Sequence, residues 1–245
     1  MKTTVIVPAR FASTRLPGKP LLDETGKPLI IHVLDNISAA ENIDQVVVAT
    51  DDDRIMQTVS NSNYKAVMTR VDHNSGTDRL AEAAENLQLA DDDIVINVQG
   101  DEPDIPPTLI ENLRDMIIKS DAPFATLCTK LDANLADDPN KVKVVFDSQE
   151  PAQALYFSRA KIPFDRDQDQ QVQHYLHIGI YAYRVWFLKK FADLPASTLE
   201  QIEKLEQLRA LENGYKIAIA PVEYAGNGID TPADYADFVR QINSK

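Results

Sequence analysis

Hydrophobic and polar positions alternate between two patterns over the first half of the chain. Short runs rich in β-branched residues, which are typical of buried strands, recur at 4–7, 46–49, 66–68 and 94–98. Stretches with helical spacing separate them, at 29–39, 53–60, 77–89 and 108–119. Alternating strands and helices predict a parallel sheet that is covered by helices on both faces. We therefore expect a doubly wound, mostly parallel α/β sheet of the Rossmann type, which binds its ligands at the carboxyl ends of its strands.

The pattern changes at about residue 123. Strand-like runs with fewer helices between them follow at 124–129, 142–146, 154–157 and 177–183. This change predicts a smaller mixed β lobe, which could also carry a dimerisation surface. The expected organisation is a single domain over 1–245, with a ligand-binding core at about 1–122, the lobe at about 123–190, and a C-terminal part at about 191–245 that returns to the core.

Two short motifs predict helix starts near the end of the chain. Ser197-Thr-Leu-Glu200 has the residues of a capping box and predicts a helix that runs to about Glu212. The apolar positions expected to face the core from this helix are Ile202, Leu205 and Leu208. Proline suits the first turn of a helix, so Thr231-Pro-Ala-Asp234 predicts the start of the last helix.

Composition excludes several classes of protein. The chain has 245 residues, 44% of them hydrophobic, which is enough to bury a substantial core. Its formal net charge of −13 argues against a nucleic-acid-binding protein, which would present a broad basic face. Cys128 is the single cysteine, so no intramolecular disulfide forms and a reducing compartment is suitable. We see no signal peptide and no apolar run of the ~20 residues that a membrane span needs, and we expect a soluble, cytoplasmic protein.

A basic loop interrupts this acidic background. Residues 1–22 carry Lys2, Arg10, Arg15 and Lys19 and no acidic residue. The loop follows the first predicted strand, and a loop in that place can direct backbone N–H groups and cationic side chains at phosphate oxygens. It therefore predicts a polyphosphate site, and the alternative is an ordinary solvated basic turn.

Two carboxylates are candidates for a metal site. Asp101 follows the predicted strand at 94–98, and carboxylates in such a place near a triphosphate are natural ligands of Mg²⁺. Glu102 and Asp104 are adjacent candidates, but residue alternation directs them elsewhere. Asp230 lies in a turn-rich run before the last helix. The alternatives are helix capping for Asp101 and an Asx turn or helix cap for Asp230, although Thr231 competes for the cap.

Motifs along nearly the whole chain resemble one enzyme family. Pro8-Ala-Arg-Phe-Ala-Ser-Thr-Arg-Leu-Pro-Gly-Lys19 resembles the signature loop of the sugar-nucleotide cytidylyltransferases. Further matching segments follow in order at 49–51, 69–79, 97–103, 156–159, 177–181, 205–209 and 228–232. Together they resemble the 3-deoxy-manno-octulosonate cytidylyltransferase family. Each motif is weak alone, and the ordered set is specific.

The resemblance implies a fold and a reaction. The fold is that of the nucleotidyltransferases, and the reaction joins CTP and a 3-deoxy-manno-octulosonate-type acid sugar to give CMP-sugar and pyrophosphate for lipopolysaccharide synthesis. The anomeric hydroxyl of the sugar attacks the α-phosphorus. Mg²⁺ held by Asp101 and Asp230 orients and activates that hydroxyl, with another Mg²⁺ on the triphosphate. The resemblance also implies a homodimer.

The resemblance assigns roles to further residues. Arg10, Arg15 and Lys19 neutralise the triphosphate, and Arg15 and Lys19 join the two carboxylates in catalysis. The residues expected to contact the cytidine part of CTP are Ser75, Arg79 and Gln99. The residues expected to bind the sugar acid are Arg159, His177, Tyr181, Glu206 and Gln207.

Structural roles compete with some of these assignments. Thr77 could be the N-cap of a helix, His177 a buried structural histidine, and Glu206 part of a solvated helix face. His177 and Tyr181 are four residues apart in a predicted strand, so both should lie on one face. His32, His73 and His174 have no metal-ligand spacing, and we assign no zinc.

Two positions depart from the family pattern. Leu176 stands where relatives carry a basic residue before the His-x-Gly-x-Tyr motif, and Phe164 stands where tryptophan is common. A missing cation would suit a sugar that itself carries a positive group, such as the 8-amino-3,8-dideoxy sugar that some members of the family are thought to use. The further alternatives are an acylneuraminate-type cytidylyltransferase and a non-catalytic nucleotide-binding regulator. The presence of both Asp101 and Asp230 argues against a regulator.

Overall fold

The computed structural model divides the chain into two compact units. It describes residues 1–12, 16–73, 75–167, 172–224, 226 and 228–244. The first unit comprises Met1–Asn112 and Gly226–Lys245, and the second comprises Leu113–Ala225. Among the helices of these described ranges, none has the length and apolar character that a bilayer span requires.

The first unit contains a parallel sheet in the order β3-β2-β1-β4. Its strands are β1 (Thr3–Ala9), β2 (Gln45–Thr50), β3 (Lys65–Met68) and β4 (Ile94–Asn97). Ile6 of β1 lies opposite Val47 of β2 on one side and Asn97 of β4 on the other. The centres of β1 and β4 are fully buried, as expected for parallel strands that are covered on both faces. The strands predicted from the apolar runs are confirmed.

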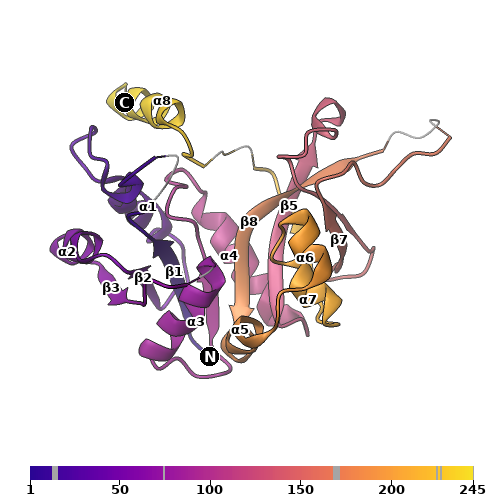
Figure 1. Cartoon of the computed structure of the whole chain (residues 1–245), viewed down its shortest axis with the longest axis horizontal. Coiled ribbons are helices and arrows are strands. Elements are labelled where there is room, and N and C mark those ends of the chain that lie inside the picture. Colours follow the sequence, from indigo (N-terminus) through magenta and orange to yellow (C-terminus); the bar gives the residue numbers. More distant parts are fainter. Residues whose placement is uncertain (13–15, 74, 168–171, 225, 227, 245) are drawn as a thin grey trace. The chain divides into compact units, whose positions relative to one another are not determined.

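The connections of this sheet reverse direction between β1 and β4. Helices α1 (Leu29–Ile37) and α2 (Asp53–Asn61) lead from β1 to β2 and from β2 to β3, moving outward (Figure 1). Helix α3 (Gly76–Asn86) then carries the chain back to β4, on the other side of β1. In open α/β sheets such a reversal is where ligands bind, beyond the carboxyl ends of the strands. Helix α4 (Pro107–Lys119) follows β4.

The last helix packs against the start of the first unit. Helix α8 (Pro232–Asn243) begins at the N-cap Thr231, whose side chain accepts a hydrogen bond from the Asp234 N–H in a capping box, and the predicted start of the last helix is confirmed. Its residues Tyr235 and Phe238 share a buried cluster with Leu16, Leu29 and Ile229. This packing brings the segment that carries Asp230 to the short 3₁₀ helix η1 (Lys19–Leu21).

The second unit has a mixed sheet, as the sequence predicted. Strand β5 (Phe124–Leu131) runs antiparallel to β8 (His174–Arg184) and parallel to β9 (Ile217–Pro221). Strands β6 (Lys143–Phe146) and β7 (Ala154–Ser158) form an antiparallel pair, and β6 also contacts β8. The 3₁₀ helix η2 (Ala133–Leu135) follows β5. The prediction missed β9.

The long helix predicted from Ser197 to Glu212 is wrong. The chain instead forms α6 (Thr198–Glu203) and α7 (Leu208–Glu212), and α5 (Val185–Asp193) precedes them without having been predicted. Lys204 ends α6 because its φ of 55° lies in the left-handed region, from which a right-handed helix does not continue. This break turns Ile202 outward, where it is 73% exposed, whereas Leu205 and Leu208 are buried as expected.

Candidate active site

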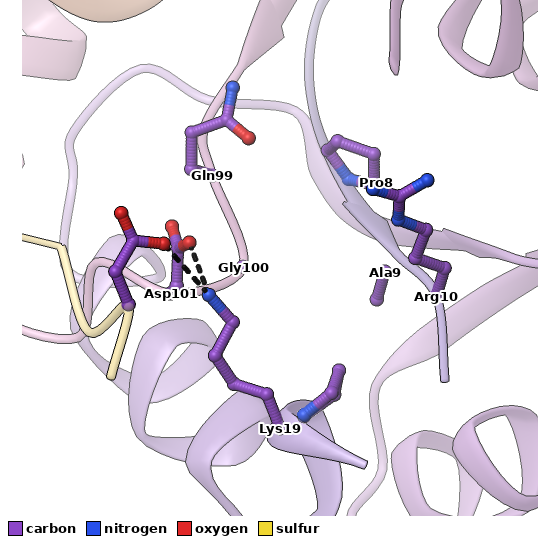
Figure 2. Close-up of a pocket in the computed structure, with 9 residues that line it drawn as sticks. Pro8, Ala9, Arg10, Lys19, Gln99, Gly100 and Asp101 are labelled. Carbon is purple, nitrogen blue, oxygen red and sulfur yellow. Dashed lines mark hydrogen bonds and ion pairs between the residues drawn. The ribbon is translucent and has the colours of Figure 1, made fainter. Parts of the chain in front are cut away.

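The carboxyl ends of β1 and β4 form a pocket with η1 and the segment before α8 (Figure 2). The pocket lies between the ends of β1 and β4, where the sheet connections reverse direction. The residues that line it are Pro8, Ala9, Arg10, Lys19, Pro20, Gln99, Gly100, Asp101 and Asp230. Segments far apart in the sequence therefore meet here, and Glu102 and Asp104 are not among the lining residues.

The ammonium group of Lys19 lies between the two candidate carboxylates. Its Nζ is 2.6 Å from Oδ2 of Asp101 and 3.6 Å from Oδ1 of Asp230, and it donates a 2.8 Å hydrogen bond to the carbonyl oxygen of Ile229. Figure 2 shows two dashed lines leaving this ammonium group, while Arg10 lies on the far side of the pocket in that view. The side chains are 15% exposed for Lys19, 26% for Asp101 and 44% for Asp230. A single cation thus contacts both carboxylates.

Local backbone features hold Asp101 and Asp230 near each other. The N–H of Ile229 donates a 2.9 Å hydrogen bond to the carbonyl oxygen of Asp101, which ties the two segments together. At Gly100, a Cβ atom would lie 3.2 Å from the carbonyl oxygen of Pro8, so a small residue lets β1 and the loop after β4 approach closely. Thr231 is the cap of α8, and the alternative that Asp230 is itself the cap is therefore wrong.

The donor set at this point suits a hard divalent cation. Mg²⁺ prefers oxygen ligands and is usually held by one or two protein carboxylates together with substrate phosphates and water. Asp101 and Asp230 supply such carboxylates. Within the described ranges no cluster of three or more His, Cys, Asp or Glu residues could hold a metal, so a metal here would need ligands from substrate or water.

A second pocket adjoins the first and shares Pro8, Ala9, Arg10 and Gln99 with it. Its remaining lining residues are His73, Ser75, Gly76 and Arg79. Arg79 is 5% exposed, and its guanidinium donates to Oδ2 of Asp51 at 2.7 Å and to Oγ1 of Thr69 at 2.6 Å. These contacts hold the Arg79 guanidinium in place, and Arg79 forms part of the wall of the second pocket.

The N-cap of α3 is Ser75, so the alternative of a cap at Thr77 is wrong. The Ser75 side chain accepts a 3.1 Å hydrogen bond from the N–H of Asp78, whose own carboxylate accepts from the Ser75 N–H. Next to it, His73 contacts Glu82. Burial acts to raise the pKa of Glu82, but hydrogen bonds from the Arg70 N–H and from His73 outweigh it and hold that pKa below its usual value.

The basic loop is braced by a residue that sequence reasoning missed. The guanidinium carbon of Arg54 lies 3.4 Å from the centre of the Phe11 ring, a cation–π contact. Asp52 holds this guanidinium through both carboxylate oxygens, and these hydrogen bonds lower the pKa of Asp52. The loop closes where the Gly18 N–H donates to the Phe11 carbonyl oxygen, with Gly18 at a φ of 67°. Arg15 lies outside the described residues.

In the second unit a β-bulge brings His177 and Tyr181 together. Cys128 and Thr126 are two residues apart on β5, yet they pair with His177 and Tyr181, which are four apart on β8. Strand β8 therefore has two more residues than β5 over this stretch, and Gly179 lies within it. The ring centroids of His177 and Tyr181 are 5.4 Å apart. Four residues of regular strand would span about 13 Å. The predicted shared face is confirmed, but the closeness of the rings comes from the bulge.

Hydrogen bonds at Thr126 fix the tautomer of His177, and its surroundings keep it uncharged. Oγ1 of Thr126 lies 2.8 Å from the carbonyl oxygen of Ile180 and 3.1 Å from that of Ile178, and 3.1 Å from Nε2 of His177. Since carbonyl oxygens only accept, the hydroxyl proton is directed to them and its oxygen accepts from the His177 Nε2–H. Nδ1 is left as an acceptor. Burial lowers the pKa of His177 to about 3, so the ring is neutral near pH 7.

Arg159 is held largely by backbone carbonyl groups. Its Nε donates to the carbonyl oxygen of Glu203 at 2.7 Å and its Nη1 to that of Pro139 at 2.9 Å. The Glu203 carboxylate accepts in turn from the Arg159 N–H at 2.9 Å and from Oγ of Ser158 at 2.6 Å. Two N–H groups of the Arg159 guanidinium are therefore already bonded to carbonyl oxygens of the chain.

Lys143 is a buried cation that the sequence did not single out. It is 0% exposed, and its Nζ donates to the carbonyl oxygens of Arg159 at 2.6 Å and Asp138 at 2.8 Å. Burial lowers its pKa, against the opposing effect of nearby carboxylates. Leu176 pairs with this lysine in the sheet register. The sequence signal was slight, a single lysine at the start of an apolar run.

Glu206 and Gln207 lie in the connection between α6 and α7, not within the long helix that was predicted. Gln207 is 4% exposed, and its Nε2 is buried with no hydrogen-bond partner among the described residues. A buried amide of this kind is costly unless something accepts from it. This donor is thus suited to a ligand oxygen.

Comparison with known proteins gives consistent matches. The family model described as Cytidylyltransferase matches residues 4–217. The chain is 48% identical to a 3-deoxy-manno-octulosonate cytidylyltransferase of Thermodesulfovibrio yellowstonii, over 100% of this chain and 99% of that protein. It is also 48% identical to one of Aeromonas hydrophila, over 99% of each.

Solved structures are similar as well. One of CMP:2-keto-3-deoxy-manno-octonic acid synthetase complexed with CTP has a TM-score of 0.93 and 44% identity, covering 100% of this chain and 99% of that one. A cytidylyltransferase from Leptospira borgpetersenii has a TM-score of 0.65 at 18% identity, covering 100% of this chain and 88% of that one, and shows likeness of fold alone.

Proposed function

The chain belongs to the cytidylyltransferase family, and from this we propose that it transfers CMP from CTP to a 3-deoxy-manno-octulosonate-type acid sugar. In this reaction the anomeric oxygen forms a bond to the α-phosphorus, and the bond from that phosphorus to the pyrophosphate oxygen breaks. The hydroxyl proton passes to water and pyrophosphate leaves. The observation that carries the proposal is the meeting of Lys19, Asp101 and Asp230 in the pocket where the sheet connections reverse.

The first pocket supplies the electrostatics of the transfer. Lys19 and Arg10 line it, and both can lie against phosphate oxygens once the triphosphate is bound. Arg15 follows in the same loop in sequence and is proposed for the same role. These positive charges stabilise the negative charge that develops on the departing pyrophosphate, and no covalent nucleophile is required.

Asp101 and Asp230 are the residues that would hold Mg²⁺. When bound, Mg²⁺ supplies positive charge that offsets the repulsion between the triphosphate and an incoming oxygen. The two carboxylates fix where that charge stands relative to Lys19 and Arg10. This arrangement keeps an anionic nucleotide in a protein of strongly negative net charge.

The second pocket suits the cytidine part of CTP. Gln99 and Arg10 line both pockets, so a nucleotide whose phosphates lie in the first would place its nucleoside toward the second. Ser75 and Gly76 line this pocket at the N-terminus of α3, and their small side chains leave room for a ligand. Gln99 offers an amide that can both donate to and accept from a base edge.

The cluster of the second unit suits an acid sugar. His177, neutral and with an acceptor at Nδ1, lies beside Tyr181 and can accept from a sugar hydroxyl. Gln207 offers a buried donor, and Arg159 a cation for a carboxylate. Glu206 would accept hydrogen bonds from hydroxyl groups of the sugar.

A second candidate substrate is the 8-amino-3,8-dideoxy form of the same sugar. Leu176 favours it, because an apolar side chain stands before the His177 motif where a cation would repel an ammonium group on the sugar. The ammonium of Lys143, which pairs with Leu176 in register, is fully buried and bound to two carbonyl oxygens. A strong preference for the 8-hydroxy sugar in kcat/KM would exclude this candidate.

Three broader features complete the proposal. The product would enter lipopolysaccharide synthesis, the reaction would take place in the cytoplasm, and the enzyme would act as a homodimer. They rest on the family resemblance. Light scattering of the purified protein tests the dimer directly.

The decisive experiment is pyrophosphate release from CTP and Mg²⁺, with the 8-hydroxy and 8-amino sugars compared side by side. Release with either sugar that is lost in Asp101→Ala supports the proposed function, and the better substrate identifies the sugar. If neither sugar releases pyrophosphate, an acylneuraminate-type sugar is tested next. Failure there too would leave a nucleotide-binding regulator.

A further inference from the structure

We propose that the Lys19 ammonium is the resident counter-ion of Asp101 and Asp230, and that a divalent cation binds these carboxylates only when nucleotide phosphate takes Lys19 in exchange. This inference rests on the proposed function for the identity of the nucleotide and the metal. It adds an order of events: the metal and the triphosphate bind together, and Lys19 changes partners as they bind.

The geometry places Lys19 where a shared cation would stand. Its Nζ is 2.6 Å from Asp101 and 3.6 Å from Asp230, and the carbonyl oxygen of Ile229 holds it at 2.8 Å. Two carboxylates alone would attract a dication strongly. With the ammonium between them, an incoming dication meets a like charge at close range and loses part of that attraction.

When nucleotide is present, its phosphate groups offer Lys19 an alternative anionic partner. Lys19 begins η1, directly after Gly18, and it lines the same pocket as Arg10. A lysine ammonium is a compact charge on a flexible stem, so it can move to a phosphate oxygen without a change in the backbone. Its departure leaves Asp101 and Asp230 to the dication. By linkage, nucleotide and metal then strengthen each other's binding by one common factor.

The test measures Mn²⁺ binding by electron paramagnetic resonance, without sugar and without turnover. The proteins are the wild type, Lys19→Met and the control Lys27→Met, which removes a surface lysine paired with Asp35 in the same unit. Each is titrated alone and with the non-hydrolysable analogue α,β-methylene-CTP. We expect Lys19→Met to bind Mn²⁺ at least tenfold more tightly than the wild type in the absence of nucleotide. The gain in Mn²⁺ affinity caused by the analogue should shrink by a similar factor, and Lys27→Met should match the wild type.

Two further variants keep the test decisive. Lys19→Gln is neutral but keeps a hydrogen-bond donor for Asp101, and it should also bind Mn²⁺ more tightly. Lys19→Arg keeps the charge and should bind Mn²⁺ as weakly as the wild type. Thermal unfolding verifies that each variant is folded. Mn²⁺ binding that is unchanged or weaker in both neutral variants overturns the inference. Mn²⁺ binding by Lys19→Arg that is as tight as in the neutral variants overturns it too.

The outcome is separable from the proposed function. If the wild type releases no pyrophosphate with any sugar while the neutral variants bind Mn²⁺ more tightly, the proposed function fails and the counter-ion role stands. If the wild type releases pyrophosphate and the neutral variants show no gain in Mn²⁺ affinity, only the counter-ion role fails.

Discussion

The polar side chains of the first pocket and those around His177 are held in opposite ways. In the first unit, charged groups hold charged groups, as in the pairs Lys19–Asp101 and Arg79–Asp51. Around His177 in the second unit the partners are uncharged: His177 is bound by the Thr126 hydroxyl, and Lys143 by two carbonyl oxygens. The first arrangement can exchange one ion for another, and the second cannot.

This difference suits the two ligands that the regions are proposed to bind. A triphosphate and a metal ion bring their own charges and can replace the internal partners of Lys19 and the carboxylates. A sugar brings mainly hydroxyl groups, which are recognised by donors and acceptors fixed in place beforehand. The contrast can be tested by substitutions that act on one region or the other.

The largest expected effect tests the charged region. Asp101→Asn keeps the shape of the side chain but removes its charge. We expect the initial rate of pyrophosphate release to fall about a thousandfold, which corresponds to about 4 kcal/mol. Asp35→Asn, a surface carboxylate of the same unit, is the matched control and should keep the wild-type rate. A loss of less than tenfold in a folded Asp101→Asn protein would remove this carboxylate from catalysis.

The next effect tests the fixed region. Lys143→Met removes the donor for two carbonyl oxygens, so we expect the free energy of unfolding to fall by about 2–4 kcal/mol. Urea unfolding followed by circular dichroism measures it. Lys130→Met is the control, since Lys130 is 65% exposed on β5, and it should change stability by about 0.5 kcal/mol or less. Equal stability of the two variants would mean that the contacts of Lys143 contribute nothing.

The pKa of His177 predicts a pH dependence of stability. The folded-state pKa of about 3 is below the usual 6.5, so between these values the unfolded chain binds a proton that the folded chain does not. Stability should therefore fall as the pH falls below 6.5, by up to about 1.4 kcal/mol per pH unit from this group. His177→Gln is uncharged at every pH. Between pH 6.5 and 5 its free energy of unfolding should therefore fall by about 2 kcal/mol less than that of the wild type. Parallel curves for the two proteins would refute a neutral His177 in the folded state.

The smallest expected effect concerns the brace of the basic loop. Arg54→Ala removes the contact with Phe11, worth about 1 kcal/mol. We expect the KM for CTP to rise about three- to tenfold while kcat stays nearly constant, because Phe11, which follows Arg10 in the chain, is held less firmly before the nucleotide binds. Arg240→Ala, on α8 of the same unit, is the control and should leave KM unchanged. A change confined to kcat would contradict a bracing role.

The sequence predicted best where local pattern and global fold agree. The run at 94–98, apolar except for Asn97, predicted a buried strand, and this placed Asp101 beyond the end of that strand, at the pocket where Lys19 also lies. The meeting of these two residues followed from the rule that strand ends share one edge of a parallel sheet. The contact of Lys19 with both carboxylates did not follow, because it depends on side-chain positions set by packing against α8.

What could not be predicted depends on departures from regular geometry. Lys204 adopts a left-handed φ without being glycine or asparagine, so no sequence signal marked the break between α6 and α7. The bulge opposite Thr126 is marked by little more than Gly179, yet it decides how close His177 and Tyr181 lie. Lys143 looked like an ordinary strand residue, and only the fold shows that it is buried.

The return of the last segment to the first unit has a consequence for synthesis of the protein. Asp101 and Asp230 are separated by more than a hundred residues, which include the whole second unit. A ribosome adds about 5–20 residues per second, so Asp101 is made on the order of ten seconds before Asp230. During that interval a nascent chain can pair Lys19 with Asp101 but has no second carboxylate to offer. Fragments released early in translation therefore lack the complete pair of carboxylates.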